Sequence, residues 1–195
     1  MRPSALLAVA LAGHCRLVRS VGDLDDEDML QPSLLPGWSR ADVVAWLALK
    51  SLSHVGLLDG PPAGEVRKQF PDGYDQVAAV RREVAQGAQH LRSLLATAFA
   101  ELEAAWDRLP DHLWTSAGIT TAGPRSMTDI VARHLRDVEV HHVDLDNGYT
   151  PSDWPAEYVQ LELAKRLGEL DGRADPADLL AWLLGRQPAP ELSPW

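Results

Sequence analysis

The chain has 195 residues, of which 46% are hydrophobic, and its formal net charge is -10 with a pI near 5.0. This length allows one medium domain with a small appendix, and the hydrophobic content is enough for a core, which excludes wholesale disorder. The negative charge would repel a duplex nucleic acid or an anionic membrane, so neither is an expected partner.

Two rare residue types add further expectations. Only three of the 18 basic residues are lysines, which together with abundant Ala, Leu, Gly and Pro is typical of a GC-rich bacterial coding bias. Cys15 is the only cysteine, so no internal disulfide forms and the fold does not require an oxidising compartment. We expect Cys15 to be a buried, small apolar side chain rather than a catalytic thiol. No stretch approaches the ~20 apolar residues of a membrane span, and a cytoplasmic protein is expected.

Apolar residues recur at helical spacing along most of the chain, and no convincing strand is predicted. The expected long helices cover residues 4–21, 39–59, 75–109 and 126–147. Gly87 is expected to bend or break the third of them. The pairs Ser39 with Asp42 and Ser126 with Asp129 predict capping boxes at the starts of the second and fourth. The intervening residues 63–74 and 115–125 are expected loops.

Two shorter helices are expected in the last part of the chain, one beginning near Pro155 and one after Asp175 that ends near Arg186. Antiparallel helices joined by loops of this kind form a four-helix bundle. The sequence therefore predicts an all-α protein with a bundle in residues 1–150 and a short helical extension in residues 151–195.

The fourth long helix carries three histidines and four acidic residues between His134 and Asp146. Residues three and four apart share one face of a helix. One such stripe is apolar at its start and polar later: Met127, Ile130, His134, Asp137, His141 and Asp144. Val131, Val138 and Leu145 lie beside this stripe and should face the core, while Glu139 and Val143 point roughly the other way. The polar stripe is therefore expected to border the bundle interior.

This stripe supports two interpretations. A carboxylate and an imidazole at i, i+4, such as Asp137 and His141, can bind one divalent ion, with His134 and Asp144 as further ligands or as partners that orient the imidazole. Alternatively, Asp137 and His141 form a buried hydrogen-bonded pair, and His142 is a surface residue.

Three segments carry a family resemblance: PSLLPGWSRADVVAWLA (32–48), RDVEVHHVDLDNGYTPSDWP (136–155), and LLAWLLGR followed by PELSPW (within 179–195). Together and in this order they resemble the mycothiol-dependent maleylpyruvate isomerase family, which belongs to the DinB-like metalloenzyme superfamily of four-helix bundles. The resemblance implies a divalent metal, usually zinc, held by a histidine of the second helix and a Glu-x-x-x-His pair of the fourth.

By resemblance, the pair on the fourth helix falls on Asp137 and His141. The metal would lower the pKa of the thiol of mycothiol, a low-molecular-weight cofactor, and the thiolate would add to an activated double bond. The adduct rotates and the thiol leaves, which completes a cis-to-trans isomerisation; relatives instead transfer the thiol to an electrophile. An arginine that handles substrate falls on Arg186, for which the alternative is an exposed arginine at a helix end.

The sequence departs from this pattern at three places. The position of the second-helix histidine, eight residues after LPGW, is Trp46, which cannot ligate a metal. The family's glutamate is Asp137, one methylene shorter, and the C-terminal region is cut down. Candidate replacements for the lost ligand are Lys50 and Ser53 on the Trp46 face, and His14, His54 and His90 farther away.

These observations leave three hypotheses. The first is a family enzyme that acts on a small electrophilic metabolite by thiol-dependent isomerisation or S-transfer. The second is a member without the metal, in which Trp46 lines a pocket and Lys50, His134, Asp137 and His141 perform acid-base catalysis or only bind a ligand. The third is a structural or regulatory bundle without chemistry. The expected partner is a small molecule, and the expected state is a monomer or homodimer.

Overall fold

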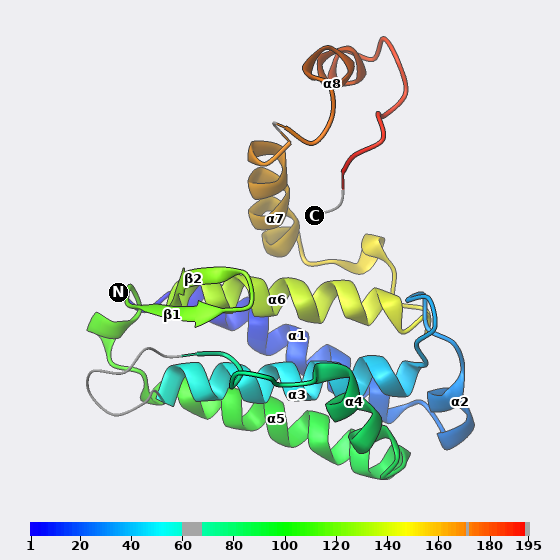
Figure 1. The fold of residues 1–195 in the computed structure, drawn as a ribbon, viewed down its shortest axis with the longest axis vertical. Helices are drawn as coiled ribbons and strands as arrows, with labels where there is room; N and C mark the ends of the chain where they lie inside the picture. Colours follow the sequence, from blue (N-terminus) through cyan, green and yellow to red (C-terminus); the bar gives the residue numbers. More distant parts are fainter. Residues whose placement is uncertain (60–67, 171, 194–195) are drawn as a thin grey trace. The chain divides into compact units, whose positions relative to one another are not determined.

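The structure is a computed structural model that describes residues 1–59, 68–170 and 172–193. It divides into two compact units, Met1–Trp154 and Pro155–Trp195. In the first unit, four long helices form a bundle (Figure 1): α1 (Ser4–Gly22), α3 (Arg40–Asp59), α5 (Ala88–Arg108) and α6 (Met127–Asp144). Helices α3 and α1 each pack against both α5 and α6. The predicted four-helix bundle is thereby confirmed.

The capping box predicted at the start of α3 is formed in full, and that predicted at the start of α6 is formed in part. At the start of α3 the Asp42 amide donates to Ser39 Oγ (3.2 Å), and the Ser39 amide donates to the Asp42 carboxylate (2.8 Å). At the start of α6 the Asp129 amide donates to Ser126 Oγ over 3.1 Å. Each cap satisfies an amide that has no partner within the helix, and so fixes where the helix begins.

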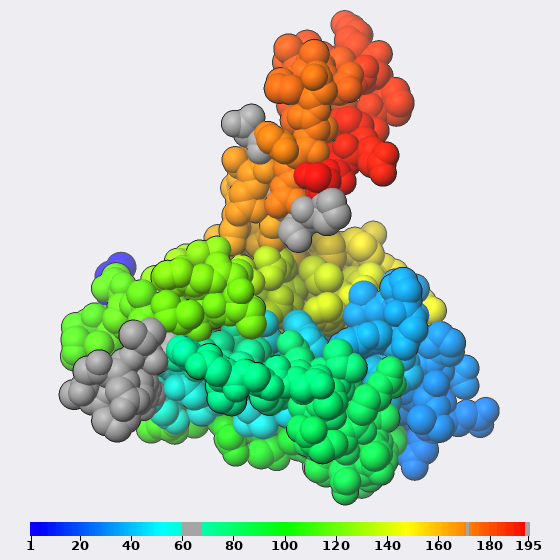
Figure 2. Space-filling model, viewed as in Figure 1, coloured from blue at the N-terminus to red at the C-terminus, as the bar shows by residue number. Residues whose placement is uncertain are grey.

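Gly87 breaks the third predicted helix into α4 (Gln76–Val84) and α5. Its φ of +91° is a backbone conformation that glycine adopts without steric cost. The short helix α2 (Asp26–Leu30) precedes α3. On the face shown in Figure 2, α4 and the chain just before it cover much of α3, which packs against α4.

The expected loop over residues 115–125 is instead a β-hairpin, so this part of the prediction is wrong. Strands β1 (Ala117–Thr120) and β2 (Gly123–Ser126) pair antiparallel, and Gly123 has a φ of +90° at the turn. The Gln69 amide adds a hydrogen bond to the Ile119 carbonyl (2.9 Å). Residues 63–67 of the other expected loop lie outside the described residues. Strands of only four residues that contain Gly and Pro give no readable alternation of polar and apolar positions.

Three further expectations are wrong. Cys15 is exposed on α1 instead of buried. Glu139, expected to point away from the core, is 1% exposed, and His142, a surface residue in the second interpretation of the stripe, is 3% exposed. Helix α6 is therefore buried on two sides, because α1 covers the face opposite the one that meets α3.

Two helices, α1 and α3, are long and apolar enough to cross a membrane by length and composition alone. In α3, 67% of the relevant window is buried within the bundle, as in the core helix of a folded domain. Burial against neighbouring helices thus accounts for the apolar character of α3.

The second unit contains α7 (Ala156–Gly168) and α8 (Pro176–Leu183). Asp175 caps α8 by accepting a hydrogen bond from the Ala177 amide (2.8 Å), with Pro176 in the first helical position, as the sequence predicts. Helix α8 ends at Leu183, three residues before the expected end.

Candidate functional site between α3 and α6

The site is built where one face of α3 meets the polar stripe of α6. Trp46 and Lys50 lie one turn apart on α3, and Asp137 and His141 lie one turn apart on α6. The Trp46 and His141 rings meet edge to face, with centroids 4.5 Å apart and planes at 70°. The structure therefore brings together four residues that the sequence singled out.

His141 is oriented by Asp144. Its Nδ1 lies 2.7 Å from Asp144 Oδ2, and the two side chains are 19% and 15% exposed. An ionised carboxylate only accepts, so Nδ1 carries the proton in this bond and Nε2 of neutral His141 has a free lone pair. This arrangement makes His141 a proton acceptor whose tautomer is fixed by its neighbour.

Lys50 places a cation in an apolar environment. The residue is 9% exposed, and its Nζ lies 5.4 Å from the centroid of the Trp46 ring. Burial lowers the pKa of Lys50, the charge of Asp137 opposes this shift, and the charges of Arg133 and Arg136 add to it. Asp137 is thus the negative charge that favours the ammonium form of Lys50.

Asp137 is 7% exposed and accepts a hydrogen bond from Arg136 (3.2 Å). The alternative in which Asp137 and His141 form a hydrogen-bonded pair is not what the structure has, because His141 bonds Asp144 one turn further along the helix. The carboxylate of Asp137 therefore serves the cations Lys50 and Arg136, and that of Asp144 serves the imidazole.

His134 lies deeper than the other residues of the stripe. It is 1% exposed, and its Nε2 is 2.7 Å from Nε2 of His14 on α1. His54 on α3 meets the His134 ring edge to face, with centroids 5.5 Å apart. His90 has a different partner: it bonds Glu83 near the surface over 2.7 Å. The buried histidine group thus joins three helices.

The opposite face of α6 holds a second polar group. Glu139 accepts hydrogen bonds from Arg16 and from the Tyr149 hydroxyl, each over 2.6 Å. His142 stacks on Tyr149 with ring centroids 3.7 Å apart. Burial lowers the pKa of His142 to about 4, so this imidazole is neutral at pH 7. The group fastens α6 to α1 and to the segment after α6.

Arg186 belongs to the second unit, where it is exposed just after α8. Its backbone amide donates to the Ala181 carbonyl over 2.7 Å, which closes the end of the helix. This is the position of a helix-terminal arginine.

The sequence reasoning missed that His14 and His134 are hydrogen-bonded partners. A signal for it exists: His14 lies on the same stripe of α1 as the buried Leu7, Ala10 and Leu17, and His54 lies four residues after Lys50. A histidine on the apolar side of a helix faces the interior. Which histidines meet there depends on the packing of α1, α3 and α6.

Comparison with known proteins places this geometry in a family. The family model described as the mycothiol maleylpyruvate isomerase N-terminal domain matches residues 10–146. The chain belongs to this family. The match covers most of α1, all of α3, α5 and α6, and the polar stripe of α6.

Two solved structures are similar to this chain: the mycothiol-dependent maleylpyruvate isomerase and a variant of it with one histidine changed to alanine. Each aligns with a TM-score of 0.77 at 22% identity, and covers 83% of this chain and 68% of the other. At this identity the likeness shows a shared fold. No curated protein matches the chain.

The metal of the maleylpyruvate isomerase family does not fit the side chains found here. Among the described residues, no group of three His, Cys, Asp or Glu side chains is arranged to hold a metal ion. Trp46, on which the resemblance places the histidine ligand, cannot bind a metal, and its ring lies against His141. The ammonium of Lys50 would also oppose a divalent cation beside Asp137. The Lys50 ammonium therefore already supplies the positive charge that a metal ion would bring to this site.

Proposed function

We propose that this chain is an enzyme of the mycothiol-dependent maleylpyruvate isomerase family that acts on a small electrophilic metabolite by thiol-dependent isomerisation or S-transfer, without the family's metal. The observation that carries the proposal is that the Trp46 ring lies close to the Lys50 ammonium and against His141, which Asp144 orients. It offers a buried positive charge and a fixed proton acceptor side by side.

Each group has a role in thiol addition. Nε2 of His141 takes the proton of the thiol, and Asp144 stabilises the imidazolium that forms. The sulfur then forms a bond to the electrophilic carbon, and the electron pair of the double bond moves into the conjugated carbonyl. The Lys50 ammonium stabilises the resulting negative charge, because a cation acts strongly in a site that excludes water.

The intermediate then has two outcomes. After rotation about the former double bond, the carbon–sulfur bond breaks, the double bond re-forms, and the thiol regains its proton from His141; this is isomerisation. If a proton adds to carbon before the carbon–sulfur bond breaks, the thiol stays attached; this is S-transfer. The metal-free site supports both, and the bound substrate decides between them.

Trp46 supports the proposal as the wall of the site. Its ring contacts His141 and lies close to the Lys50 ammonium, so it excludes water from both. Arg186 is retained as a candidate substrate-handling residue by family resemblance. The localisation proposed for the enzyme is the bacterial cytoplasm, where a low-molecular-weight thiol stays reduced.

The test is an isomerisation and thiol-adduct assay on the full chain, with mycothiol as the thiol and maleylpyruvate and related unsaturated oxo acids as substrates. We expect turnover that is unchanged by a chelator and is reduced at least 100-fold in His141→Ala and Lys50→Met, on the order of the contribution of one acid-base or electrostatic group. The matched control is Lys68→Met, since Lys68 is an exposed lysine paired with Asp72.

Two results would contradict the proposal in different ways. Loss of activity with chelator and its return with added zinc would show a metal enzyme in spite of Trp46. Absence of any thiol-dependent turnover, together with tight binding of the same compounds, would favour the alternative in which the chain only binds a ligand.

A further inference from the structure

The proposed reaction leaves a group of buried titratable side chains unused. His14 on α1, His54 on α3 and His134 on α6 meet inside the bundle, and they are 2%, 3% and 1% exposed. Aromatic rings enclose them: His14 stacks on Phe99 at 3.9 Å and on Trp106 at 5.5 Å between centroids. Three imidazoles in such a dry environment cost solvation free energy, which calls for a role.

The hydrogen bonds fix which imidazole nitrogens of this group carry protons. His14 Nδ1 lies 2.7 Å from Glu103 Oε1, and a carboxylate accepts, so this nitrogen carries a proton. His14 Nε2 lies 2.7 Å from His134 Nε2. With His14 neutral, its Nε2 is the acceptor, and His134 Nε2 is the donor. One ordered chain of hydrogen bonds therefore runs from Glu103 through His14 to His134.

Burial favours these neutral forms. Burial lowers the pKa of His14, although Glu103 opposes this shift. Burial also lowers the pKa of His134 well below its ordinary value, and the charges of His14, His54 and Lys50 add to the effect. The pKa of His54 falls to about 3 from burial and from the charges of Lys50 and Arg133.

The inner end of the chain is a bare nitrogen. Because Nε2 of neutral His134 carries the proton, its Nδ1 has a free lone pair, and this buried atom has no hydrogen-bond partner in the structure. From α3, the charges of His54 and Lys50 act on His134, and Lys50 stands one helical turn before His54. The lone pair of this Nδ1 atom is the one acceptor position left on the ring of neutral His134.

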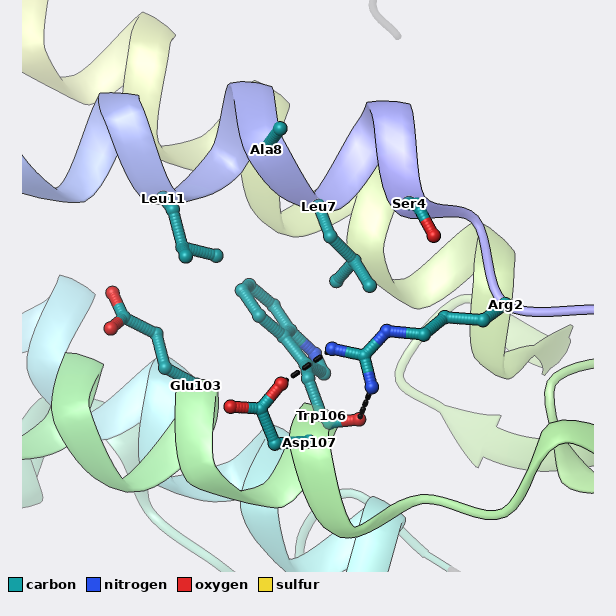
Figure 3. A pocket seen from close by; sticks show the side chains of 8 residues that line it. All are labelled: Arg2, Ser4, Leu7, Ala8, Leu11, Glu103, Trp106 and Asp107. Carbon is teal, nitrogen blue, oxygen red and sulfur yellow. Dashed lines mark hydrogen bonds and ion pairs between the residues drawn. The ribbon is translucent and has the colours of Figure 1, made fainter.

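The outer end opens into a hollow between α1 and α5. The hollow has a volume of about 260 Å³ and is lined by Glu103 together with Arg2, Leu7, Leu11, Trp106 and Asp107. In Figure 3, Glu103 stands at one end of it, and Arg2 bonds Asp107 and the Trp106 carbonyl at the other. The Glu103 side chain is 34% exposed, so water reaches it.

We propose that Glu103, His14 and His134 form a proton relay between this hollow and the bundle interior beside Lys50. It is separate from the His141–Asp144 pair, which lies on the later turns of α6. Its use in catalysis rests on the proposed function, in which the Lys50 ammonium stabilises negative charge: the relay supplies or removes the proton that Lys50 carries.

The outward transfer balances in three moves. A proton released by the Lys50 ammonium, which becomes a neutral amine, binds Nδ1 of His134. The proton on Nε2 of His134 passes to Nε2 of His14, and the proton on Nδ1 of His14 passes to the Glu103 carboxylate. Both imidazoles end neutral in the opposite tautomer, and one proton has moved from the interior to Glu103, from which water in the hollow removes it.

The reversed tautomers can carry a proton only inward, from Glu103 to the interior. The relay therefore alternates: it exports one proton and must import one before it exports again. An inward transfer therefore restores the Lys50 ammonium after an outward transfer has removed its proton.

The test is nitrogen NMR on the full chain labelled in histidine, because the signals of protonated and bare imidazole nitrogens are well separated. We expect His14 protonated at Nδ1 and His134 protonated at Nε2, with a scalar coupling between the two Nε2 atoms across the hydrogen bond. In Glu103→Leu, which removes the acceptor that fixes the chain, we expect the tautomer populations of both histidines to shift together. The matched control is Glu101→Leu, an exposed site on the same helix, which should change neither.

The relay is refuted if His14 and His134 show no coupling across their Nε2 atoms, or if Glu103→Leu changes the His14 tautomer and leaves that of His134 as it was. The measurement needs no substrate, so its outcome is independent of whether the proposed isomerisation or S-transfer is found. If turnover is established, Glu103→Leu should also shift its pH profile, which a purely structural role of Glu103 would leave in place.

Discussion

Glu139→Ala is the substitution that most directly tests the packing of α6 against α1. Glu139 is 1% exposed and accepts from Arg16 and the Tyr149 hydroxyl at 2.6 Å each. Its Oε1 also lies 3.0 Å from where a Cβ on Gly13 would stand, so α1 approaches closely at this glycine. The carboxylate is thus enclosed by two hydrogen-bond donors and by the backbone of α1 at Gly13.

The expected loss follows from what the substitution leaves behind. Removing one partner of a buried charge pair costs roughly 3–5 kcal/mol. The Arg16 side chain is 34% exposed and regains some water, which places the expected loss near the lower limit, at about 3 kcal/mol. For a chain of this size the melting temperature should fall by roughly 6–12 °C.

Urea unfolding followed by circular dichroism measures the free energy, with Glu101→Ala as an exposed control expected to stay within about 0.5 kcal/mol of wild type. A second readout is specific to the contact. Burial raises the pKa of Tyr149, and its hydrogen bond to Glu139 raises it further. An alkaline absorbance titration should therefore show this pKa lowered in Glu139→Ala. A loss below about 1 kcal/mol with an unchanged Tyr149 titration would refute the reasoning.

Two other predictions follow from the interior of the bundle. The folded-state pKa values of His54 and His142, about 3 and about 4, lie below the ordinary value of 6.5, so the unfolded chain binds more protons in acid. The free energy of unfolding should be highest above pH 6.5. It should fall toward pH 4 by up to about 1.4 kcal/mol per pH unit for each histidine. Urea titrations across this range should show a smaller slope for His54→Leu and an unchanged one for the exposed His112→Leu. Separately, the double variant Trp46→His with Asp137→Glu restores the ligand types that the family resemblance implies. Calorimetry should find that it binds zinc at least about tenfold more tightly than wild type, a difference of about 1.4 kcal/mol. Equally tight binding by wild type would contradict the metal-free site.

Local sequence patterns predicted the bundle because its helices are specified locally. The side chains of Ser39 and Asp42, and the hydroxyl of Ser126, accept from amides three residues away, so the start of each helix can be predicted from adjacent residues in the sequence. Gly87 likewise ends one helix and precedes another by its own backbone freedom. The family membership was also readable from ordered segments, of which 32–48 and most of 136–155 lie within the residues that the family model matches.

The hairpin and the second buried face of α6 were not readable. Strands β1 and β2 owe their pairing to each other and to Gln69, about fifty residues earlier in the chain, and no pattern within four residues encodes it. Glu139 was expected to face away because an acid on the far side of a helix is usually solvated. It is buried because Arg16, 123 residues earlier, and Tyr149, beyond the end of the helix, donate hydrogen bonds to it.

The candidate site divides in the same way. The sequence by itself determined which residues share one face: Trp46 with Lys50, and His134, Asp137, His141 and Asp144 along α6, because the helical repeat fixes their spacing. Only the tertiary structure decided which of them meet. His141 bonds Asp144 instead of Asp137, Trp46 lies against His141, and His134 pairs with His14 over 120 residues away in sequence. Contacts within one helix follow from its period, whereas contacts between helices depend on how their side chains interlock, which is set by the packing of the whole core.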